Sequence, residues 1–364
     1  MARALALAAR GLGRTFPNPA VGAVFVRGGR VVGEGFHARA GGPHAEIEAL
    51  RRAGRKAMGA DLYVTLEPCA HTGRTPPCVA SLLPLRLRRV VVAVVDPNPK
   101  VRGRSVRALR RAGVRVTTGV RATEGLELIR GYRRWMLDGR PWVVLKLAAS
   151  LDGRIAAAGG RFGWITGVPA RRRAHAMRAV TDAVLVGAQT VRTDDPRLTC
   201  RTRRGADPVR VVVSGPRLEL STRANVFARG AAPVWVIAPR GASRRRAAAL
   251  RRAGAEIELL PGRAGRVSFR RIVAALGKRG VTRLLIEGGG AVAAAALEAQ
   301  VVDEIALFLA PIVIGAAGVP AVGSLRVPNV GRAVRLGALR VEAVGRDLLV
   351  TAAVRHGHSP LPPR

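Results

Sequence analysis

The chain has 364 residues, of which 48% are hydrophobic and three are cysteines. This length is enough for two or three domains with separate cores, and three cysteines exclude a small secreted protein held together by disulfides and favour a reducing, cytoplasmic compartment. The formal net charge of +39 is of a size that is typical of nucleic-acid-binding proteins.

The distribution of the basic residues argues against a dedicated nucleic-acid face. Only four of the 62 are lysines, and they divide almost evenly, with 27 in residues 1–150 and 28 in residues 151–300. Aromatic residues, which stack on bases, make up only 4% of the chain. We interpret the charge as an arginine-for-lysine bias of the whole surface, from which non-specific attraction to polyanions would still follow.

The first half of the chain alternates strand and helix patterns. The apolar run from Ala4 to Ala9 is too short for a signal-peptide core and predicts a first helix. After it we expect a hairpin at 20–37, strands at 61–68, 88–97 and 114–119, and helices at 44–54, 104–112 and 124–138. Gly139-Arg140-Pro141 is a strong stop signal and predicts a domain boundary. We therefore expect domains at 1–140 and 141–355, and a disordered tail at 356–364.

The second half repeats this kind of alternation. It predicts strands at 142–150, 182–187, 209–215, 233–239, 282–289 and 304–310, a C-terminal pair around 340–354, and helices at 169–180, 243–253 and 269–280. Both halves thus predict three-layer α/β domains. Residues 305–325 carry no charge and could span a bilayer by length. Because Pro311, Pro320 and three glycines interrupt them, we expect a buried strand that runs into a loop, and no membrane span.

A candidate metal site lies in the first half. His44 begins a predicted helix with Glu46 two positions on, and Cys69 follows a strand and a proline. Cys78 comes after two prolines, at a second predicted helix start. One imidazole and two thiolates would leave the fourth position of a zinc ion open, which is the pattern of catalytic sites. The alternative is that the cysteines are simply buried and the histidine lies on the surface.

The cysteines are nine positions apart, whereas zinc deaminases of nucleobases generally carry P-C-x-x-C. The inserted loop, residues 70–75, offers an imidazole, hydroxyls, a glycine and a guanidinium beside the metal. This chemistry suits an anionic group such as a phosphate. The alternative is a solvated surface loop.

These motifs resemble the deaminase domain of the bifunctional riboflavin-biosynthesis proteins. The matching segments are PNPAVGAV (17–24), GEGFHARAGGPHAE (33–46), YVTLEPCAHTGRTPPC (63–78) and DPNP (96–99). In that family the nine-residue cysteine spacing is the rule. The resemblance implies a domain with a cytidine-deaminase-like fold, which deaminates 2,5-diamino-6-ribosylamino-4(3H)-pyrimidinone 5′-phosphate. It implies zinc ligands His44, Cys69 and Cys78, with Glu46 as the proton shuttle, and substrate contacts at Asn18, His71, Thr72 and Arg74.

The second half has a signal of its own at residues 287–290. There a buried strand ends in Glu287 and three glycines, and an alanine-rich helix begins. Backbone N–H groups at such a helix start can approach a pyrophosphate, although a glycine-rich turn is a weak signal by itself. Residues 190–196 predict a polar loop after a buried strand, where an α/β sheet places its ligands.

The second half resembles the reductase domain of the same family, a relative of dihydrofolate reductase. KLAASLDGRIAAAGG (146–160), WITG (164–167), GAQTVRTDDPRLTCR (187–201) and LLIEGGGAVAAAAL (284–297) carry the resemblance, which covers residues 2 to 355. It implies NADPH-dependent reduction of the ribosyl group to ribityl. The implied NADPH contacts are Ala148, Trp164, Thr190, Asp194, Gly288, Gly289 and Gly290, and the implied substrate contacts are Arg178, Leu198, Arg201 and Glu287.

Two positions depart from the family pattern. Phe162 stands where a serine often touches the substrate, and Ser214-Gly215 stands where an Asp-Ser pair is common. His175 and Cys200 are not given a role. We expect a homo-oligomer, a dimer, that has no specific nucleic-acid partner.

Two other classes of protein compete with this interpretation. One is a zinc deaminase acting on nucleic acid, with a basic appended domain; the charge favours it, and the strand pattern of the second half opposes it. The other is a non-enzymatic interaction protein stabilised by zinc, against which Glu46 and the open fourth position argue.

Overall fold

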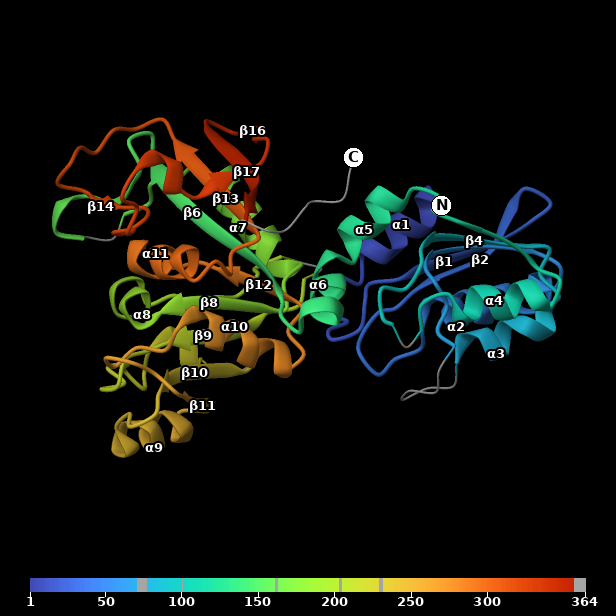
Figure 1. The fold of residues 1–364 in the computed structure, drawn as a ribbon, viewed down its shortest axis with the longest axis horizontal. Helices are drawn as coiled ribbons and strands as arrows, with labels where there is room; N and C mark the ends of the chain where they lie inside the picture. The colour runs from blue at the N-terminus through green and yellow to red at the C-terminus, as the bar shows by residue number, and fades with distance from the viewer. Residues whose placement is uncertain (71–76, 100, 161–162, 203–204, 229–231, 357–364) are drawn as a thin grey trace. The chain divides into compact units, whose positions relative to one another are not determined.

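The structure is a computed structural model that describes residues 1–70, 77–99, 101–160, 163–202, 205–228 and 232–356. It divides into two compact units, Met1–Arg140 (unit 1) and Pro141–Arg364 (unit 2) (Figure 1). The division falls within the Gly139-Arg140-Pro141 stretch. Both units are built from a sheet covered by helices, so the predicted α/β class is confirmed.

Unit 1 is built on a five-stranded sheet of order β2-β1-β3-β4-β5. Its strands are β1 (Gly22–Arg27), β2 (Arg30–Phe36), β3 (Asp61–Leu66), β4 (Arg89–Val94) and β5 (Arg115–Thr118). β1 pairs antiparallel with β2 and β3, while β3, β4 and β5 are mutually parallel. The predicted hairpin turns at Gly28 and Gly29, whose positive φ angles of 55° and 76° suit the tight turn that joins twisted strands.

Helices cover both faces of this sheet. They are α1 (Ala2–Ala9), α2 (Ala45–Ala53), α3 (Cys78–Leu82), α4 (Arg104–Arg111), α5 (Ala122–Leu128) and α6 (Arg130–Asp138). Helices α2, α3 and α4 share one buried cluster with the strands, whereas α1 packs on Val24 in a separate cluster. Figure 1 shows α1 and α5 on the side of the sheet opposite to α2 and α3. Unit 1 therefore has three layers.

Two glycines of β2 set the distance of helix α2 from the sheet. A Cβ added to Gly33 would lie 2.4 Å from the carbonyl oxygen of Ala49, and one added to Gly35 would lie 2.5 Å from the Ala49 nitrogen. Only glycine permits such close approach of two backbones. The GEG stretch thereby fixes the helix that follows His44 and carries Glu46 in its first turn.

Unit 2 is built on a larger, mainly parallel sheet of order β11-β10-β9-β8-β12-β6-β13-β17-β15, with β16 paired to β17. The strands are β6 (Trp142–Ser150), β8 (Ala183–Gly187), β9 (Val209–Val213), β10 (Val234–Pro239), β11 (Ala255–Leu260), β12 (Arg283–Ile286), β13 (Glu304–Ala310), β15 (Arg335–Leu336), β16 (Arg340–Val344) and β17 (Asp347–Arg355). Two short strands, β7 (Arg154–Ala156) and β14 (Val319–Pro320), form a separate pair. From β11 to β13 all neighbours are parallel, and β17 runs antiparallel to β13.

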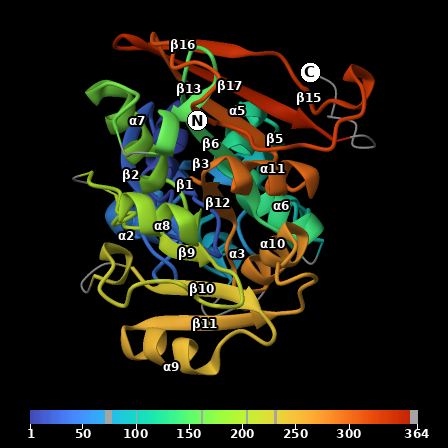
Figure 2. The ribbon, with the colours of Figure 1, turned by 90° about the vertical axis from the view of Figure 1, so that its left-hand side faces the viewer.

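The helices of unit 2 are α7 (Val168–Ala179), α8 (Ala188–Asp194), α9 (Arg244–Arg252), α10 (Phe269–Lys278) and α11 (Gly290–Glu298). Figure 2 shows β10 beside β11, with α9 next to β11. The main core joins α8 and α9 to the centre of the sheet, and a second cluster joins α7 to β13 and β17. Because β6, β8 and β12 are parallel neighbours, their carboxyl ends meet at one edge, where α/β sheets bind ligands.

Three predictions from the sequence concern local structure. The predicted helix 124–138 is interrupted at Ile129, whose ψ of 12° departs from helical geometry; its side chain lies in a buried cluster with Leu66, Ala93 and Val94. The prediction of a loop at 190–196 is wrong for most of these residues, because helix α8 extends to Asp194. The uncharged stretch 305–325 contains most of strand β13, irregular backbone and the short strand β14. Within the described part of the chain, no helix has the length and apolarity that crossing a bilayer requires.

Candidate functional sites

Three ends of secondary structure bring the predicted zinc ligands together in unit 1. His44 is the residue that precedes helix α2, Cys78 is the first residue of α3, and Cys69 lies three positions after the end of β3. One ligand atom from each of the three lies within 4.8 Å of the others. The Pro76-Pro77 signal for a helix start at Cys78 therefore agrees with α3, which begins there.

The distances suit a metal ion. The Nδ1 atom of His44 is 3.2 Å from the sulfur of Cys78 and 3.5 Å from the sulfur of Cys69. Tetrahedral zinc, with bonds of about 2.0–2.3 Å, holds its ligand atoms about 3.5–3.8 Å apart. A small adjustment would therefore accommodate the ion. One nitrogen and two sulfurs form a donor set that zinc prefers, so the residues fit the group.

The Cys69 thiol gives up its proton more readily than the Cys78 thiol. The Cys69 sulfur accepts hydrogen bonds from the Cys78 thiol and, at 3.1 Å, from the Cys78 backbone N–H. The hydrogen bond from the Cys78 side chain lowers the pKa of Cys69, and the same bond together with burial raises the pKa of Cys78. A thiolate is thus already favoured at Cys69, which prepares the cluster for a cation.

Glu46 is the buried acid of this site. Its side chain lies in the first turn of α2 and is only 3% exposed. Burial raises the pKa of Glu46 to about 7. A cation held by His44 and the cysteines would lower this value by favouring the carboxylate. Glu46 is thus a buried carboxyl beside the cluster that can gain and lose a proton, as general acid–base catalysis requires.

Asn18, the one predicted substrate contact of unit 1 that the structure describes, is linked to the cluster through His37. The Nε2 atom of His37 is 3.1 Å from Nδ2 of Asn18, and its ring lies edge-on to the His44 ring at 5.3 Å between centroids. Burial lowers the pKa of His37. No role was predicted for His37 from the sequence, although it stands in the GEGFH motif. His71, Thr72 and Arg74 lie outside the described residues.

Glu67 is a second residue whose role was missed. Its buried carboxylate accepts hydrogen bonds from the backbone N–H groups of Asp96, Gly103, Ser105 and Val106 and from the Ser105 hydroxyl, at 2.8–3.3 Å. It thereby fastens the start of helix α4 and the DPNP segment to the end of β3, two residues before Cys69. We infer a structural role for it.

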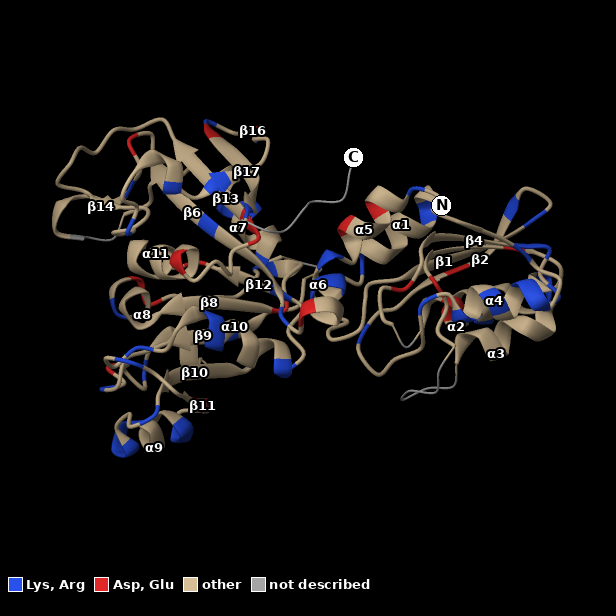
Figure 3. Ribbon diagram, viewed as in Figure 1, with Lys and Arg blue, Asp and Glu red and all other residues tan. Residues whose placement is uncertain are grey.

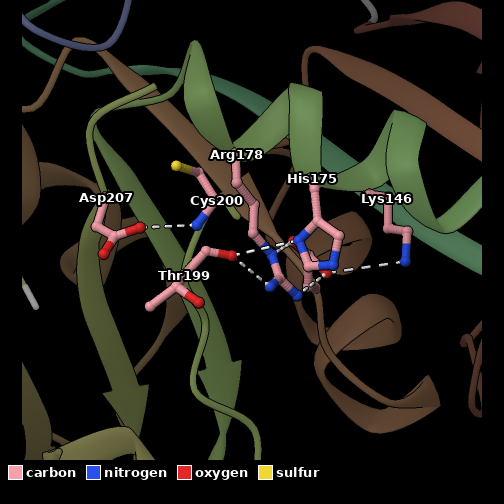
Figure 4. Close-up of polar contacts among 7 residues, drawn as sticks. Lys146, His175, Arg178, Thr199, Cys200 and Asp207 are labelled. Atoms are coloured by element: carbon pink, nitrogen blue, oxygen red, sulfur yellow. Dashed lines mark hydrogen bonds and ion pairs between the residues drawn. The ribbon is translucent and has the colours of Figure 1, made fainter. Parts of the chain in front are cut away.

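In unit 2 the predicted substrate residues Arg178 and Glu287 form one buried group of charges with Lys146. Figure 4 shows Arg178 and Lys146 of this group. The Arg178 guanidinium donates to both carboxylate oxygens of Glu287, at 2.6 and 2.9 Å, and the Lys146 ammonium lies 3.7 Å away. Burial alone would raise the pKa of Glu287, but the charges of Arg178 and Lys146 outweigh burial and lower it to about 2. Lys146 was missed; a lysine inside the apolar run WVVLKLAAS was the available signal.

The segment 198–201 contacts this group through the carbonyl oxygen of Thr199. Arg178 donates to the carbonyl oxygen of Thr199 at 3.0 Å, and His175 lies 3.3 Å from the same oxygen (Figure 4). Leu198 and Arg201, both predicted substrate contacts, adopt positive φ angles of 55° and 50°. Non-glycine residues rarely take such angles, and they do so mainly where the surroundings impose them, often at ligand sites.

Of the three glycines after β12, only Gly289 has space for a side chain. A Cβ on Gly288 would lie 2.5 Å from the Val292 side chain, and one on Gly290 would lie 2.5 Å from the Pro320 carbonyl oxygen. At Gly289 the nearest atom would be Ile155 Cδ1, at 3.9 Å. The space beside Gly289, at the start of helix α11, is therefore open to a ligand. A helix N-terminus with a side-chain-free approach fits a cofactor pyrophosphate.

The remaining predicted cofactor contacts lie on neighbouring elements. Ala148 is in β6, while Thr190 and Asp194 lie in α8, which follows β8. Trp164 is 66% exposed, and the guanidinium of Arg171 stacks on its ring at 4.6 Å. Ser214 directly follows β9, and Phe162 lies outside the described residues.

Lys and Arg residues occur on many elements of both units (Figure 3). This agrees with the even spread in the sequence.

Comparison with known proteins gives matches over both units. Residues 141–350 match the family model of the RibD C-terminal domain, and residues 1–94 match that of the cytidine and deoxycytidylate deaminase zinc-binding region. The riboflavin biosynthesis protein RibD of Aquifex aeolicus is 39% identical, with 96% of each chain covered. That of Escherichia coli is 40% identical, with 86% of this chain and 88% of the relative covered.

Solved structures agree. RibD of Acinetobacter baumannii is 36% identical and superposes with a TM-score of 0.88 over 98% of each chain. A diaminohydroxyphosphoribosylaminopyrimidine deaminase/5-amino-6-(5-phosphoribosylamino)uracil reductase of Thermotoga maritima is 35% identical. It superposes with a TM-score of 0.86 over 98% of this chain and 97% of that one.

Proposed function

The chain belongs to the RibD family of riboflavin biosynthesis proteins, and on that premise we propose that each unit holds one active site, for deamination in unit 1 and for reduction in unit 2. The deaminase domain would span residues 1–140 and the reductase domain residues 141–355. The protein is a bifunctional deaminase and reductase that uses zinc and NADPH. It deaminates 2,5-diamino-6-ribosylamino-4(3H)-pyrimidinone 5′-phosphate and then reduces the ribosyl group to ribityl. The resemblance inferred from the motifs is confirmed.

The convergence of three ligand atoms within 4.8 Å, beside the buried carboxyl of Glu46, is the observation that supports the deaminase site most strongly. His44, Cys69 and Cys78 would hold the zinc. When bound, zinc supplies the Lewis acidity that makes water a nucleophile near neutral pH.

Glu46 would move the protons of the deamination. Water adds its oxygen to the ring carbon that bears the amino group, and this carbon releases ammonia as it becomes a carbonyl. The Glu46 carboxylate accepts a proton from the attacking water and gives it to the ring nitrogen. It then accepts the second proton and passes it to the departing amino group. One carboxyl suffices because it is regenerated after each transfer.

The other predicted substrate contacts would hold the pyrimidine and its phosphate. Asn18 would bind the ring, and its contact with His37 would orient its amide. His71, Thr72 and Arg74, in the insertion between the cysteines, would contact the phosphate, for which their donors are suited.

In unit 2, the open approach to Gly289 supports a pyrophosphate site at the start of helix α11, formed with Gly288 and Gly290. Ala148, Trp164, Thr190 and Asp194 would complete the contacts to NADPH, which supplies the hydride when it is bound. Arg178, Leu198, Arg201 and Glu287 would orient the ribose and its phosphate. Lys146 and Arg178 keep Glu287 ionised, so that it can accept hydrogen bonds from sugar hydroxyls.

Family membership over nearly the whole chain accounts for unit 2 without a nucleic-acid partner, so the alternative of a nucleic-acid deaminase is not favoured. We place the protein in the cytoplasm, in agreement with its three free cysteines.

We also infer that the protein forms a homodimer. Leu336, Leu339, Val341 and Leu348 are exposed apolar residues on or beside the β15–β17 edge of the unit 2 sheet, and they offer a surface for a second copy.

Metal analysis tests the zinc site. The purified protein should contain about one zinc per chain, and Cys69→Ser and Cys78→Ser should each lose both zinc and deamination while reduction of the deaminated substrate persists. Cys200→Ser is the matched control, because Cys200 lies in unit 2 and outside the cluster. Full zinc occupancy in the Cys69→Ser, Cys78→Ser double variant would refute the site.

A further inference from the structure

His37 is held at both ring nitrogens by neighbouring groups of unit 1. Its side chain is only 2% exposed. The Nδ1 atom lies 2.9 Å from the backbone carbonyl oxygen of Pro43, and the Nε2 atom lies 3.1 Å from the side-chain nitrogen of Asn18. Neither nitrogen is left for another partner, so His37 acts on its surroundings through these two bonds.

The Pro43 contact decides which nitrogen of His37 carries the proton. A carbonyl oxygen can only accept a hydrogen bond, so Nδ1 must be the N–H donor. Among the residues that the structure describes, no carboxylate contacts the ring, and burying a cationic imidazole without a carboxylate is costly. The ring is therefore neutral, and Nε2 presents a lone pair.

The proton on His37 in turn fixes the amide of Asn18. A lone pair at Nε2 accepts a hydrogen bond, which only the NH₂ end of the amide can donate. The Oδ1 atom of Asn18 must then point away from the His37 ring. No group within the described ranges donates to Oδ1, although Asn18 is half-buried and directly contacts the His37 ring, which packs on His44. The amide thus offers an oriented acceptor beside the metal cluster.

We propose that His37 is a positioning residue for deamination, which holds Asn18 so that its Oδ1 accepts a hydrogen bond from an N–H group of the pyrimidine. This rests on the proposed function of unit 1, and on Asn18 as a contact of the ring. It predicts specificity for rings that present a donor at that position. A ring with a lone pair there would face the Oδ1 lone pairs, and an N-methylated ring would neither donate nor fit.

A purely structural role for His37 is the competing explanation. His37 also braces the segment 37–43 that leads to His44, so its loss could displace a zinc ligand. The two roles differ in how they depend on Asn18. A positioning residue has nothing left to position once Asn18 is alanine, whereas a structural brace is needed with or without it.

The first experiment determines which ring nitrogen of His37 carries the proton. In the zinc-loaded protein labelled with ¹⁵N-histidine, two-bond proton–nitrogen correlations distinguish the two neutral forms and the cation for each of the six histidines. The His37 signals are assigned from whichever of His37→Phe, His37→Gln or His37→Asn keeps the fold. We expect a protonated Nδ1 and an unprotonated Nε2. A proton on Nε2, in either the neutral or the cationic form, would overturn the proposal.

The second experiment is a double-mutant cycle on deamination. His37→Phe and Asn18→Ala should each lower kcat/KM by about tenfold or more with zinc still bound, as expected for a hydrogen bond that is lost or misdirected. In the Asn18→Ala background, His37→Phe should cause no further loss beyond about twofold. Full additivity of the two losses would show that His37 does not act through Asn18.

The same samples separate this proposal from the proposed function. Reduction of the deaminated substrate reports the state of unit 2, and metal analysis reports the zinc cluster. If the wild-type protein failed to deaminate the diaminopyrimidinone phosphate, the function would fall while the His37 protonation could still be read. If the wild type deaminates normally and a substrate analogue methylated at each ring nitrogen in turn is never discriminated against, the donor requirement is wrong.

Discussion

The guanidinium of Arg178 and the carboxylate of Glu287 form a two-point ion pair in the core of unit 2, with side chains only 13% and 9% exposed. The Lys146 ammonium adds a second cation 3.7 Å from Glu287. One buried anion therefore serves two cations, so the two partners of the pair are not equivalent.

This asymmetry predicts different costs for truncating the two partners. Glu287→Leu leaves Arg178 and Lys146 buried without a counter-charge and should destabilise unit 2 by about 3 kcal/mol or more. Arg178→Leu should cost less, because Lys146 still faces Glu287. Urea unfolding checks this through tryptophan fluorescence, since three of the four tryptophans, Trp142, Trp164 and Trp235, lie in unit 2. Equal losses, or a larger loss for Arg178→Leu, would contradict the charge arrangement.

The same carboxylate predicts a pH dependence. The pKa of Glu287 is about 2 in the folded protein, against about 4.3 in an unfolded chain. Because the folded value is depressed, the stabilisation is complete above about pH 5 and is lost as the pH falls through 4.3 towards 2. The stability difference between wild type and Glu287→Gln should therefore shrink by roughly 1–2 kcal/mol between pH 6 and pH 3. A difference that stayed constant over this range would show that the ion pair does not hold Glu287 ionised.

The glycine turn predicts which substitution removes the cofactor without harming the fold. Gly289→Val points into the open space at the start of α11 and should weaken NADPH binding by about tenfold or more, which corresponds to about 1.4 kcal/mol. Its thermal stability should match that of the wild type. Gly290→Ala is the control, because its Cβ meets the Pro320 carbonyl at 2.5 Å and should lower stability first. Wild-type NADPH affinity in Gly289→Val would exclude this turn from the pyrophosphate site.

The sequence alone was enough to bring the zinc residues together in a hypothesis, because each sits at a local signal. His44 and Glu46 share the first turn of one helix, Cys69 follows a strand, and Cys78 follows two prolines. The carboxyl ends of parallel strands lie at one edge of a sheet, so the residues that follow them come close together. The local signals were therefore enough to predict the zinc site. The fold class followed from the same alternation of buried strands and amphipathic helices.

What could not be predicted depends on contacts between distant segments. His37 gains its role from Pro43 and Asn18, and Glu67 from five donors on residues 96–106. Nothing in the local pattern of either residue specifies these partners. Lys146 likewise becomes part of a site only because β12 places Glu287 beside it. The break at Ile129 is of the same kind, because the buried cluster around this side chain is formed by residues of β3 and β4.

Product analysis with crossed variants tests most directly whether one chain carries two separate active sites. Wild-type protein, Glu46→Gln and Gly289→Val are each given the diaminopyrimidinone phosphate, or its deaminated product, together with NADPH. Glu46→Gln should keep its zinc, deaminate on the order of a hundredfold more slowly, and still reduce the deaminated substrate at the wild-type rate. Gly289→Val should release ammonia normally and, at an NADPH concentration below the wild-type Kd, reduce the deaminated substrate about tenfold more slowly or worse. If either variant, folded and zinc-loaded, lost both activities together, the assignment of one active site to each unit would be wrong.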